Sequence, residues 1–312
     1  MAFELVKEKW SGSINRVNIG AKKIITVGGE NSLPFLRQEG ATPHKPVVAF
    51  EVSDIEPAGP QELVSAFGRF FKGPLYLAKS CVEEYGAELL CLKLNGAHPD
   101  AGNKTAAEEA AFVQKIHKAC SVPLIISGCG DSNKDNEVLP ACTQALKGEN
   151  CLIASVTQDN YKTIVAACLA DGHNVVAESP IDINIAKQLN ILISDMGMPP
   201  ERIVINPTVG ALGYGLEYAY SIMERARLAA LSGDKMLAMP FICFVAQETW
   251  RAKEAKASES ELPGCGPALE RGIIWEALTA AAFLQAGADI LVMRHPKAIE
   301  VVKKNIEELM KG

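Results

Sequence analysis

Short apolar runs alternate with longer amphipathic stretches along most of this 312-residue chain. Eight runs are rich in Val, Ile, Leu and Phe and short enough to be buried strands of a parallel sheet: 47–51, 89–94, 123–127, 151–154, 174–178, 202–205, 240–244 and 289–293. Apolar residues three and four positions apart predict a helix after each run, at about 76–86, 105–119, 135–147, 159–171, 183–197, 216–232, 270–286 and 297–310. The pattern therefore predicts eight successive βα units.

Eight βα units with right-handed crossovers close most economically into a barrel. We therefore predict the α/β class and a (β/α)8 TIM barrel over residues 47–312, with an open doubly wound sheet as the alternative fold. Two extended pieces, 16–19 and 23–27, predict a hairpin within an N-terminal extension of residues 1–46. Because an isolated two-stranded hairpin is only marginally stable, we expect it to pack as a cap over one mouth of the barrel.

Composition and charge narrow the classes of function. Hydrophobic residues make up 48% and charged residues 22%, which is typical of a folded globular protein. The 31 Lys and Arg against 37 Asp and Glu give a net charge of −6, and no basic run stands out, so nucleic acid is not expected as a partner. The longest apolar stretch, at 277–293, is interrupted by polar residues and predicts no membrane-spanning helix.

The nine cysteines are scattered and odd in number, and the chain opens without the basic and apolar order of a signal peptide. We therefore expect free thiols in a reducing cytoplasm, most of them in the core. No C-x-x-C pair and no histidine pair with zinc-ligand spacing occurs in the sequence. A self-contained zinc or iron–sulfur site is therefore not expected.

Candidate chemistry lies immediately after the apolar runs, because the working face of a TIM barrel is formed by the C-terminal ends of its strands. Amides, hydroxyls and glycines dominate these positions. Amides and hydroxyls both donate and accept hydrogen bonds, which suits a large ligand with amides or a heteroaromatic ring, such as a corrin or a pterin. On this basis we select eight candidate ligand-facing residues: Asn95, Asp131, Asn184, Asn206, Thr208, Gly210, Gln247 and Arg294.

Phosphate-binding signatures are missing from the sequence. The ends of the last two strands lack the glycine-rich turn that holds a phosphorylated sugar in many barrels. The stretch 96–105 has one residue too many between its glycines, and an Asn before its Lys, to be a P-loop. We therefore reject a phosphate-binding interpretation.

Several positions allow two interpretations. The glycine-rich stretch 210–215 is either a loop that lets a flat ligand approach the backbone or a tight turn into the next helix. The long polar connection 247–269 is either a lid or docking surface, or a solvated loop that begins with a frayed helical turn. His295, at a strand end, could titrate near neutrality and serve a site. Four strand-end carboxylates are either general acids or helix N-caps: Asp54, Asp131, Asp159 and Asp182.

Four longer motifs resemble a known family nearly end to end: SPIDINIAKQLN at 179–190, GYGLEY at 213–218 with SIMER at 221–225, WRAKEA at 250–255, and LVMRHP at 291–296. They resemble the small subunit of the corrinoid/iron–sulfur protein of the anaerobic acetyl-CoA (Wood–Ljungdahl) pathway, together with its archaeal delta-subunit relatives. The resemblance implies a barrel similar to that of pterin-binding methyltransferases. It also implies a heterodimer with a large subunit that holds a [4Fe–4S] cluster and the main corrinoid domain.

By the same resemblance, the heterodimer carries a methyl group on corrinoid cobalt. It takes the group from methyltetrahydrofolate through a separate methyltransferase and delivers it to acetyl-CoA synthase/CO dehydrogenase. This chain would cover the reactive face of the shared corrinoid, with the eight candidate residues facing it and with no catalytic residue or metal ligand of its own. The sequence agrees to the extent that the cobalamin-ligating pattern D-x-H-x-x-G does not occur, since 171–173 continues into Asn174-Val175-Val176.

Two other functions stay open. In the first, the barrel itself binds a methyl pterin, gripped by Asp131 and Asn206, and donates the methyl group to a corrinoid partner. In the second, the barrel is a scaffold that only docks the methyltransferase and the synthase. Affinity of the isolated chain for methyltetrahydrofolate distinguishes the first of these from a carrier subunit.

Overall fold

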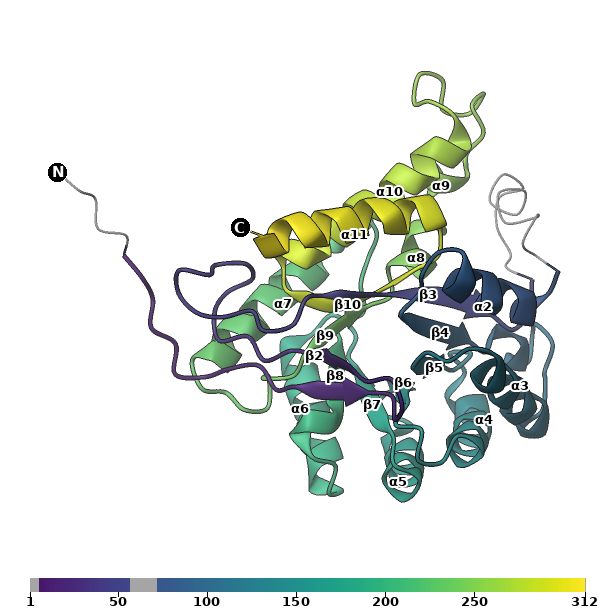
Figure 1. The fold of residues 1–312 in the computed structure, drawn as a ribbon, viewed down its shortest axis with the longest axis horizontal. Helices are drawn as coiled ribbons and strands as arrows, with labels where there is room; N and C mark the ends of the chain where they lie inside the picture. Colours follow the sequence, from purple (N-terminus) through teal and green to yellow (C-terminus); the bar gives the residue numbers. More distant parts are fainter. Residues whose placement is uncertain (1–5, 57–71, 312) are drawn as a thin grey trace.

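The computed structural model describes residues 6–56 and 72–311, which form a closed barrel of eight parallel strands (Figure 1). β10 pairs with β3 in parallel, with Ile290 opposite Val47 and Met293 opposite Phe50, and this pairing closes the sheet. The predicted TIM barrel is confirmed, and the open-sheet alternative is wrong. In barrel order the strands are β3 (Val47–Ser53), β4 (Leu89–Lys93), β5 (Leu124–Ser127), β6 (Leu152–Val156), β7 (Asn174–Glu178), β8 (Ile203–Asn206), β9 (Phe241–Cys243) and β10 (Ala288–Met293).

The eight predicted helices are all present and surround the barrel (Figure 1). Local caps set where several of them begin: Thr105 and Glu108 form a capping box on α3, and Asp131 accepts a hydrogen bond from the backbone N–H of Lys134 at 2.8 Å. This cap starts α4 three residues earlier than its apolar spacing predicts. The helices are α2 (Pro74–Glu83), α3 (Ala106–Ala119), α4 (Ser132–Ala145), α5 (Tyr161–Asp171), α6 (Ile183–Asp195), α7 (Leu216–Leu231), α10 (Ala268–Gln285) and α11 (Pro296–Lys311).

Short helices lie in three of the connections. The connection after β9 contains α8 (Val245–Thr249) and α9 (Lys253–Lys256), which precede a loop that projects from the barrel beside α10 (Figure 1). The 3-10 helices η1 (Asn95–Ala97) and η2 (Pro200–Arg202) follow β4 and precede β8. The connection 247–269 is therefore helical in its first part, where the loop interpretation places a frayed helical turn.

Side chains alternate between two cores along each strand. In β3, Val47 and Ala49 belong to the cluster inside the barrel, whereas Val48 and Phe50 belong to the cluster between the barrel and its helices. The burial pattern of β3 is continuous because both faces of the strand are covered.

The N-terminal hairpin closes one mouth of the barrel. β1 (Val17–Ile19) and β2 (Ile25–Val27) pair antiparallel, and Val17, Ile19 and Val27 belong to the same buried cluster as the barrel interior. Asn174, the first residue of β7, donates from Nδ2 to the carbonyl oxygen of Asn18 at 2.8 Å, and Asn150 just before β6 donates to the same oxygen at 2.7 Å. The hairpin therefore covers the N-terminal ends of the strands and leaves the C-terminal ends to form a site.

Most of the cysteines lie in the core, as expected. Seven of the nine cysteines are buried and free, Cys129 is half-buried and Cys265 is exposed. Burial raises the pKa of the Cys81 thiol to about 12. Among the helices of the described residues, none has the length and apolar character needed to cross a bilayer.

The packing of the hairpin predicts that Ile19→Ala destabilises the protein. Ile19 is fully buried against the barrel interior, so truncation should lower the free energy of unfolding by about 2–5 kcal/mol. Urea denaturation measures the change. Ile24→Ala in the turn of the same hairpin is the control, because Ile24 is 58% exposed and its truncation should change stability by less than about 0.5 kcal/mol. Equal losses in the two variants would contradict a hairpin that is packed in this orientation.

Candidate functional site

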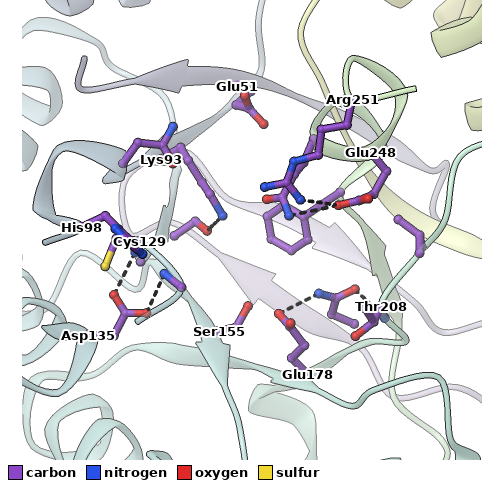
Figure 2. A pocket seen from close by; sticks show the side chains of 18 of the residues that line it. Glu51, Lys93, His98, Cys129, Asp135, Ser155, Glu178, Thr208, Glu248 and Arg251 are labelled. Carbon is purple, nitrogen blue, oxygen red and sulfur yellow. Dashed lines mark hydrogen bonds and ion pairs between the residues drawn. The ribbon is translucent and has the colours of Figure 1, made fainter. Parts of the chain in front are cut away.

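A cavity of about 590 Å³ lies at the C-terminal mouth of the barrel, and Figure 2 shows side chains that line it. The hairpin covers the other mouth. Residues near or just after the C-terminal end of every barrel strand line the cavity, beginning with Glu51 in β3 and ending with Arg294 just after β10. Amide, hydroxyl and charged groups make up most of the lining. The closed barrel therefore brings together side chains that are up to 243 positions apart in sequence, such as Glu51 and Arg294.

Five of the eight predicted residues line the cavity: Asn95, Asn206, Thr208, Gln247 and Arg294. The other three lie outside its lining and have local structural partners. Asp131 caps α4, Asn184 is exposed in the first turn of α6, and Gly210 packs against the backbone of Tyr214, which would overlap a side chain at that position. The contribution of these three residues to a ligand site stays a prediction.

The four strand-end carboxylates do not come together at a common site. Asp131 and Asp182 are the N-caps of α4 and α6, as the capping interpretation predicts. Asp54 accepts from the backbone N–H of Gly96 at 2.9 Å, and Asp159 lies exposed in a turn. None of these four carboxylates lines the cavity.

Glu51 and Arg294 form a buried ion pair on one side of the cavity. Arg294 Nε donates to Glu51 Oε1 at 3.0 Å, and Glu51 is only 6% exposed. Each charge is compensated by the other, which a buried ion needs in order to stay ionised. Glu51 was missed in the sequence because it was counted in an apolar run, although a charged residue inside a buried strand is the signal that marks it.

Glu178, Asn206 and Thr208 form a second polar group, at the ends of β7 and β8. Asn206 Nδ2 donates to Glu178 Oε2 at 3.0 Å, while Asn206 Oδ1 accepts from the backbone N–H of Thr208 at 3.1 Å. Thr208 has a φ of 57°, in the left-handed region that a β-branched residue rarely adopts, and its Oγ1 donates to the carbonyl oxygen of Ser179 at 2.6 Å. These bonds fix the Asn206 amide and hold the Glu178 carboxylate at the cavity (Figure 2).

Lys93 and Asp135 form the third polar group. Lys93 Nζ donates to Ser127 Oγ at 3.1 Å and lies 5.6 Å from the centre of the Phe244 ring. Asp135 accepts from the backbone N–H groups of Cys129 at 2.8 Å and Gly130 at 3.1 Å, while burial raises the pKa of Asp135. Asp135 lies within α4, so an inspection limited to strand ends could not find it.

The segment after β9 forms one wall of the cavity. Gln247, Glu248, Trp250, Arg251 and Lys256 all line it. The first half of the 247–269 connection therefore lies at the site, and its movement as a lid stays a prediction.

The expectation that a neighbouring residue, His295, titrates near neutrality is wrong, because burial lowers the pKa of His295 to about 4 and keeps the ring neutral.

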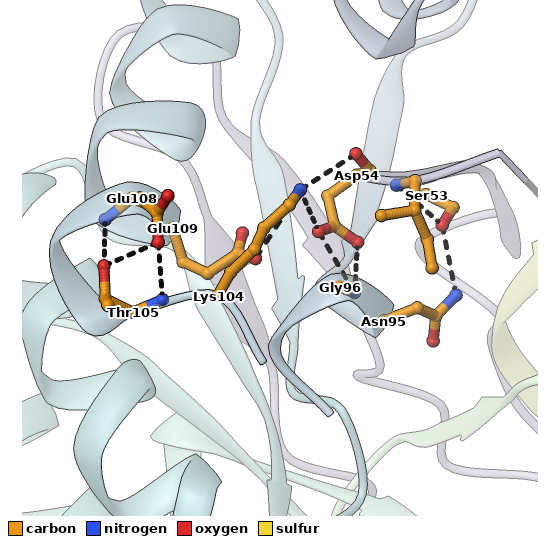
Figure 3. A network of polar contacts seen from close by, with 9 residues as sticks. Ser53, Asp54, Asn95, Gly96, Lys104, Thr105, Glu108 and Glu109 are labelled. Carbon is orange, nitrogen blue, oxygen red and sulfur yellow. Dashed lines mark hydrogen bonds and ion pairs between the residues drawn. The ribbon is translucent and has the colours of Figure 1, made fainter. Parts of the chain in front are cut away.

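A buried ionic network supports the β4–α3 loop, which carries Asn95 to the cavity (Figure 3). Lys104 Nζ lies 2.6 Å from Asp54 Oδ2 and 3.9 Å from Glu109 Oε1. Two causes raise the pKa of Glu109 to about 8: the larger is burial, and the second is the nearby Asp54 carboxylate. Lys104 is thus held between the side chains of Asp54 and Glu109.

The described residues contain no group of three or more His, Cys, Asp or Glu side chains arranged to hold a metal ion. The side chains that line the cavity instead offer both donors and acceptors of hydrogen bonds, together with the Glu51–Arg294 ion pair. Such a lining can orient a large polar ligand and keep water away from part of it.

Comparisons with known proteins give one family and one fold. A family model described as CO dehydrogenase/acetyl-CoA synthase delta subunit matches residues 16–305. The acetyl-CoA decarbonylase/synthase complex subunit delta of Archaeoglobus fulgidus is 35% identical, over 97% of this chain and 70% of that protein. The subunit of the same name from Methanocaldococcus jannaschii is 34% identical, over 95% of this chain and 74% of that protein.

Solved structures with a similar fold are dihydropteroate synthases. The enzyme of Xanthomonas albilineans with 4-aminobenzoic acid superimposes with a TM-score of 0.59 and 16% identity, over 95% of this chain and 98% of that chain. The same enzyme in complex with 7,8-dihydropteroate gives a TM-score of 0.58 and 15% identity, over 95% and 99% of the two chains. At this level of identity the likeness establishes the fold alone.

The Glu109 network predicts that stability falls as the pH rises. A carboxyl whose pKa is raised in the folded state contributes stability that is complete below its unfolded pKa, near 4.5, and is lost as the pH rises through about 8. Glu109→Gln should therefore reduce the loss of unfolding free energy between pH 5 and pH 9, measured by urea denaturation. It should not abolish that loss, because burial also raises the pKa of Glu276, to about 7.

Glu308→Gln is the control for this measurement. Glu308 is exposed on α11, far from the network in sequence, and its variant should keep the wild-type pH dependence. If Glu109→Gln and Glu308→Gln gave the same dependence on pH, the account of the network would be wrong.

Proposed function

Because this chain belongs to the CO dehydrogenase/acetyl-CoA synthase delta subunit family, we propose that it is the small subunit of a heterodimeric corrinoid/iron–sulfur methyl carrier in the anaerobic acetyl-CoA pathway. In this role it covers the corrinoid at the C-terminal mouth of the barrel. The observation that carries the proposal is the polar cavity there, with amide, hydroxyl and charged groups from all eight strand ends. The other mouth is filled by the hairpin.

The chemistry of the cavity fits a corrinoid. A corrin ring carries many amide side chains, and each amide needs both an acceptor and a donor. The lining supplies amides that do both at Asn95, Asn160, Asn206 and Gln247, and hydroxyls at Ser155, Thr157 and Thr208. Glu51 and Arg294 neutralise each other, so the cavity can face a large ligand without exposing an unpaired buried charge on that side.

Residues of this chain would hold and shield the corrinoid while the corrinoid supplies the methyl-transfer chemistry at its metal. Asn206, fixed by Glu178 and Thr208, would accept and donate hydrogen bonds in one orientation. Phe244 and Trp250 would exclude water from the wall of the cavity. In this proposal no residue of the chain acts as a catalyst and none ligates a metal.

The partners in this proposal are other proteins of the pathway. A large subunit supplies the main corrinoid domain and the [4Fe–4S] cluster, a methyltransferase brings the methyl group from methyltetrahydrofolate, and acetyl-CoA synthase/CO dehydrogenase receives it. The names of the relatives, which are subunits of an acetyl-CoA decarbonylase/synthase complex, support an assembly of this kind. We propose the cytoplasm as its location. No Cys pair in C-x-x-C spacing occurs in the sequence, which is consistent with a cluster held by the partner.

A pterin-binding methyltransferase is the second candidate, and the Glu178–Asn206 pair is the observation that favours it. A carboxylate and an amide side by side can take the N–H and carbonyl edge of a heteroaromatic ring. Asp131, to which the sequence assigned part of this grip, caps α4 and lies outside the lining, so Glu178 would take its place.

Co-purification tests the carrier proposal most simply. The chain expressed with the large subunit should bring down a second polypeptide with the visible absorbance of a corrinoid and an iron–sulfur cluster. Asn206→Ala should lower corrinoid retention about tenfold, since it removes hydrogen bonds from a buried polar site, while Asn184→Ala, an exposed amide outside the cavity, should retain it fully. Equal retention in the two variants would favour a scaffold that only docks its partners.

Titration of the isolated chain with methyltetrahydrofolate separates the two candidates. The carrier proposal predicts no measurable heat of binding by calorimetry, because the ligand-holding role requires the corrinoid and its subunit. Binding that is lost in Glu178→Gln but kept in Asn184→Ala would overturn the carrier proposal in favour of the pterin methyltransferase.

A further inference from the structure

Glu276 is a fully buried carboxylate on α10 that lies behind the cavity without lining it. Its Oε1 accepts a hydrogen bond from the backbone N–H of Arg294 at 2.6 Å. Its Oε2 accepts from the backbone N–H of His295 and from Trp250 Nε1, both at 3.1 Å. Three N–H donors around one carboxylate hold it in a single orientation, so this side chain joins a helix, the end of β10 and the segment after β9.

Trp250 connects Glu276 to the wall of the cavity, because it bonds Glu276 and lines the cavity. Its side chain is nearly buried, and its ring packs directly on the backbone of α10 at Gly272, where a Cβ would overlap the ring. The ring centre is 6.1 Å from that of His295. The α8–α9 segment (residues 245–256), in which the two helices are only five and four residues long, is attached to the barrel at this point.

Arg294 connects Glu276 to the neighbouring part of the cavity wall, at the ends of β10 and β3. The backbone of Arg294 is fixed by Glu276, and its guanidinium then reaches Glu51 on β3. We propose that Glu276 is a positioning residue for the cavity, which holds the α8–α9 segment and the Glu51–Arg294 pair in one arrangement. The cavity is shaped by a carboxylate that no ligand touches.

Glu276→Gln tests the proposal because it keeps the volume of the side chain and changes its hydrogen bonding. A glutamine accepts at one oxygen only, and its amide N–H groups would face the N–H donors of Trp250, His295 or Arg294. Hydrogen exchange of the whole chain should become at least about tenfold faster in peptides covering 245–256 and 290–296, because a buried N–H group in each loses its acceptor. Wild-type exchange in both peptides would overturn the proposal.

Two further variants separate positioning from general destabilisation. Ile19→Ala weakens the protein at the other mouth and should leave the relative exchange of 245–256 unchanged. Trp250→Phe keeps an aromatic ring but removes the donor to Glu276, so it should accelerate exchange in 245–256 and not in 290–296. If Glu276→Gln does not fold, the exchange of Trp250→Phe decides. The proposal is contradicted if exchange in 245–256 is as slow as in the wild type, or if Ile19→Ala accelerates it equally.

A binding readout extends the test and rests on the proposed function. In the complex co-purified with the large subunit, Glu276→Gln should retain at least about tenfold less corrinoid, while Ile19→Ala and Glu270→Gln, an exposed carboxylate on the same helix, should retain the wild-type amount. Equal retention in Glu276→Gln would overturn the link between positioning and the ligand. If the wild-type complex held no corrinoid, the proposed function would fail, and the exchange measurements would still decide whether Glu276 positions the cavity.

Discussion

Closure of eight parallel strands into a barrel is the constraint on which the rest of this structure depends. Closure puts every second side chain of each strand into a shared interior and brings all eight C-terminal strand ends to one mouth. The hairpin fills the other mouth with Val17, Ile19 and Val27. An apolar interior with one closed end therefore leaves a single face among the described residues where polar side chains from every strand meet.

Charges collected at that mouth must be compensated where they are buried. Glu51 is paired with Arg294, and Asp135 takes two backbone N–H groups. Behind the cavity, Glu276 takes three donors, and Asp54 holds Lys104. Because each of these groups is bonded to a different element, satisfying the charges also fixes the loops that surround the cavity. The same bonds that stabilise the fold thus determine the shape of the site.

The strands and helices were predictable because their apolar spacing reflects burial directly, and the end of β8 led to Asn206 and Thr208. Glu51, Lys93 and Glu178 were missed because each lies within a run counted as strand, where only the three-dimensional closure shows that its side chain reaches the cavity. Asp131 was selected as a ligand-facing residue, but capping of α4 uses its carboxylate. Local hydrogen bonding and distant contacts compete for such residues, and sequence spacing alone does not decide between them.

The most direct test of the account is the footprint of the corrinoid-loaded large subunit on this chain, measured by hydrogen exchange with and without that partner. The account predicts protection at the C-terminal mouth, in residues 94–98, 128–131, 207–215 and 245–256, with the hairpin at 16–27 unchanged. Protection confined to the hairpin end, or to the outer helices with the mouth unchanged, would contradict the claim that this barrel covers the corrinoid with its cavity.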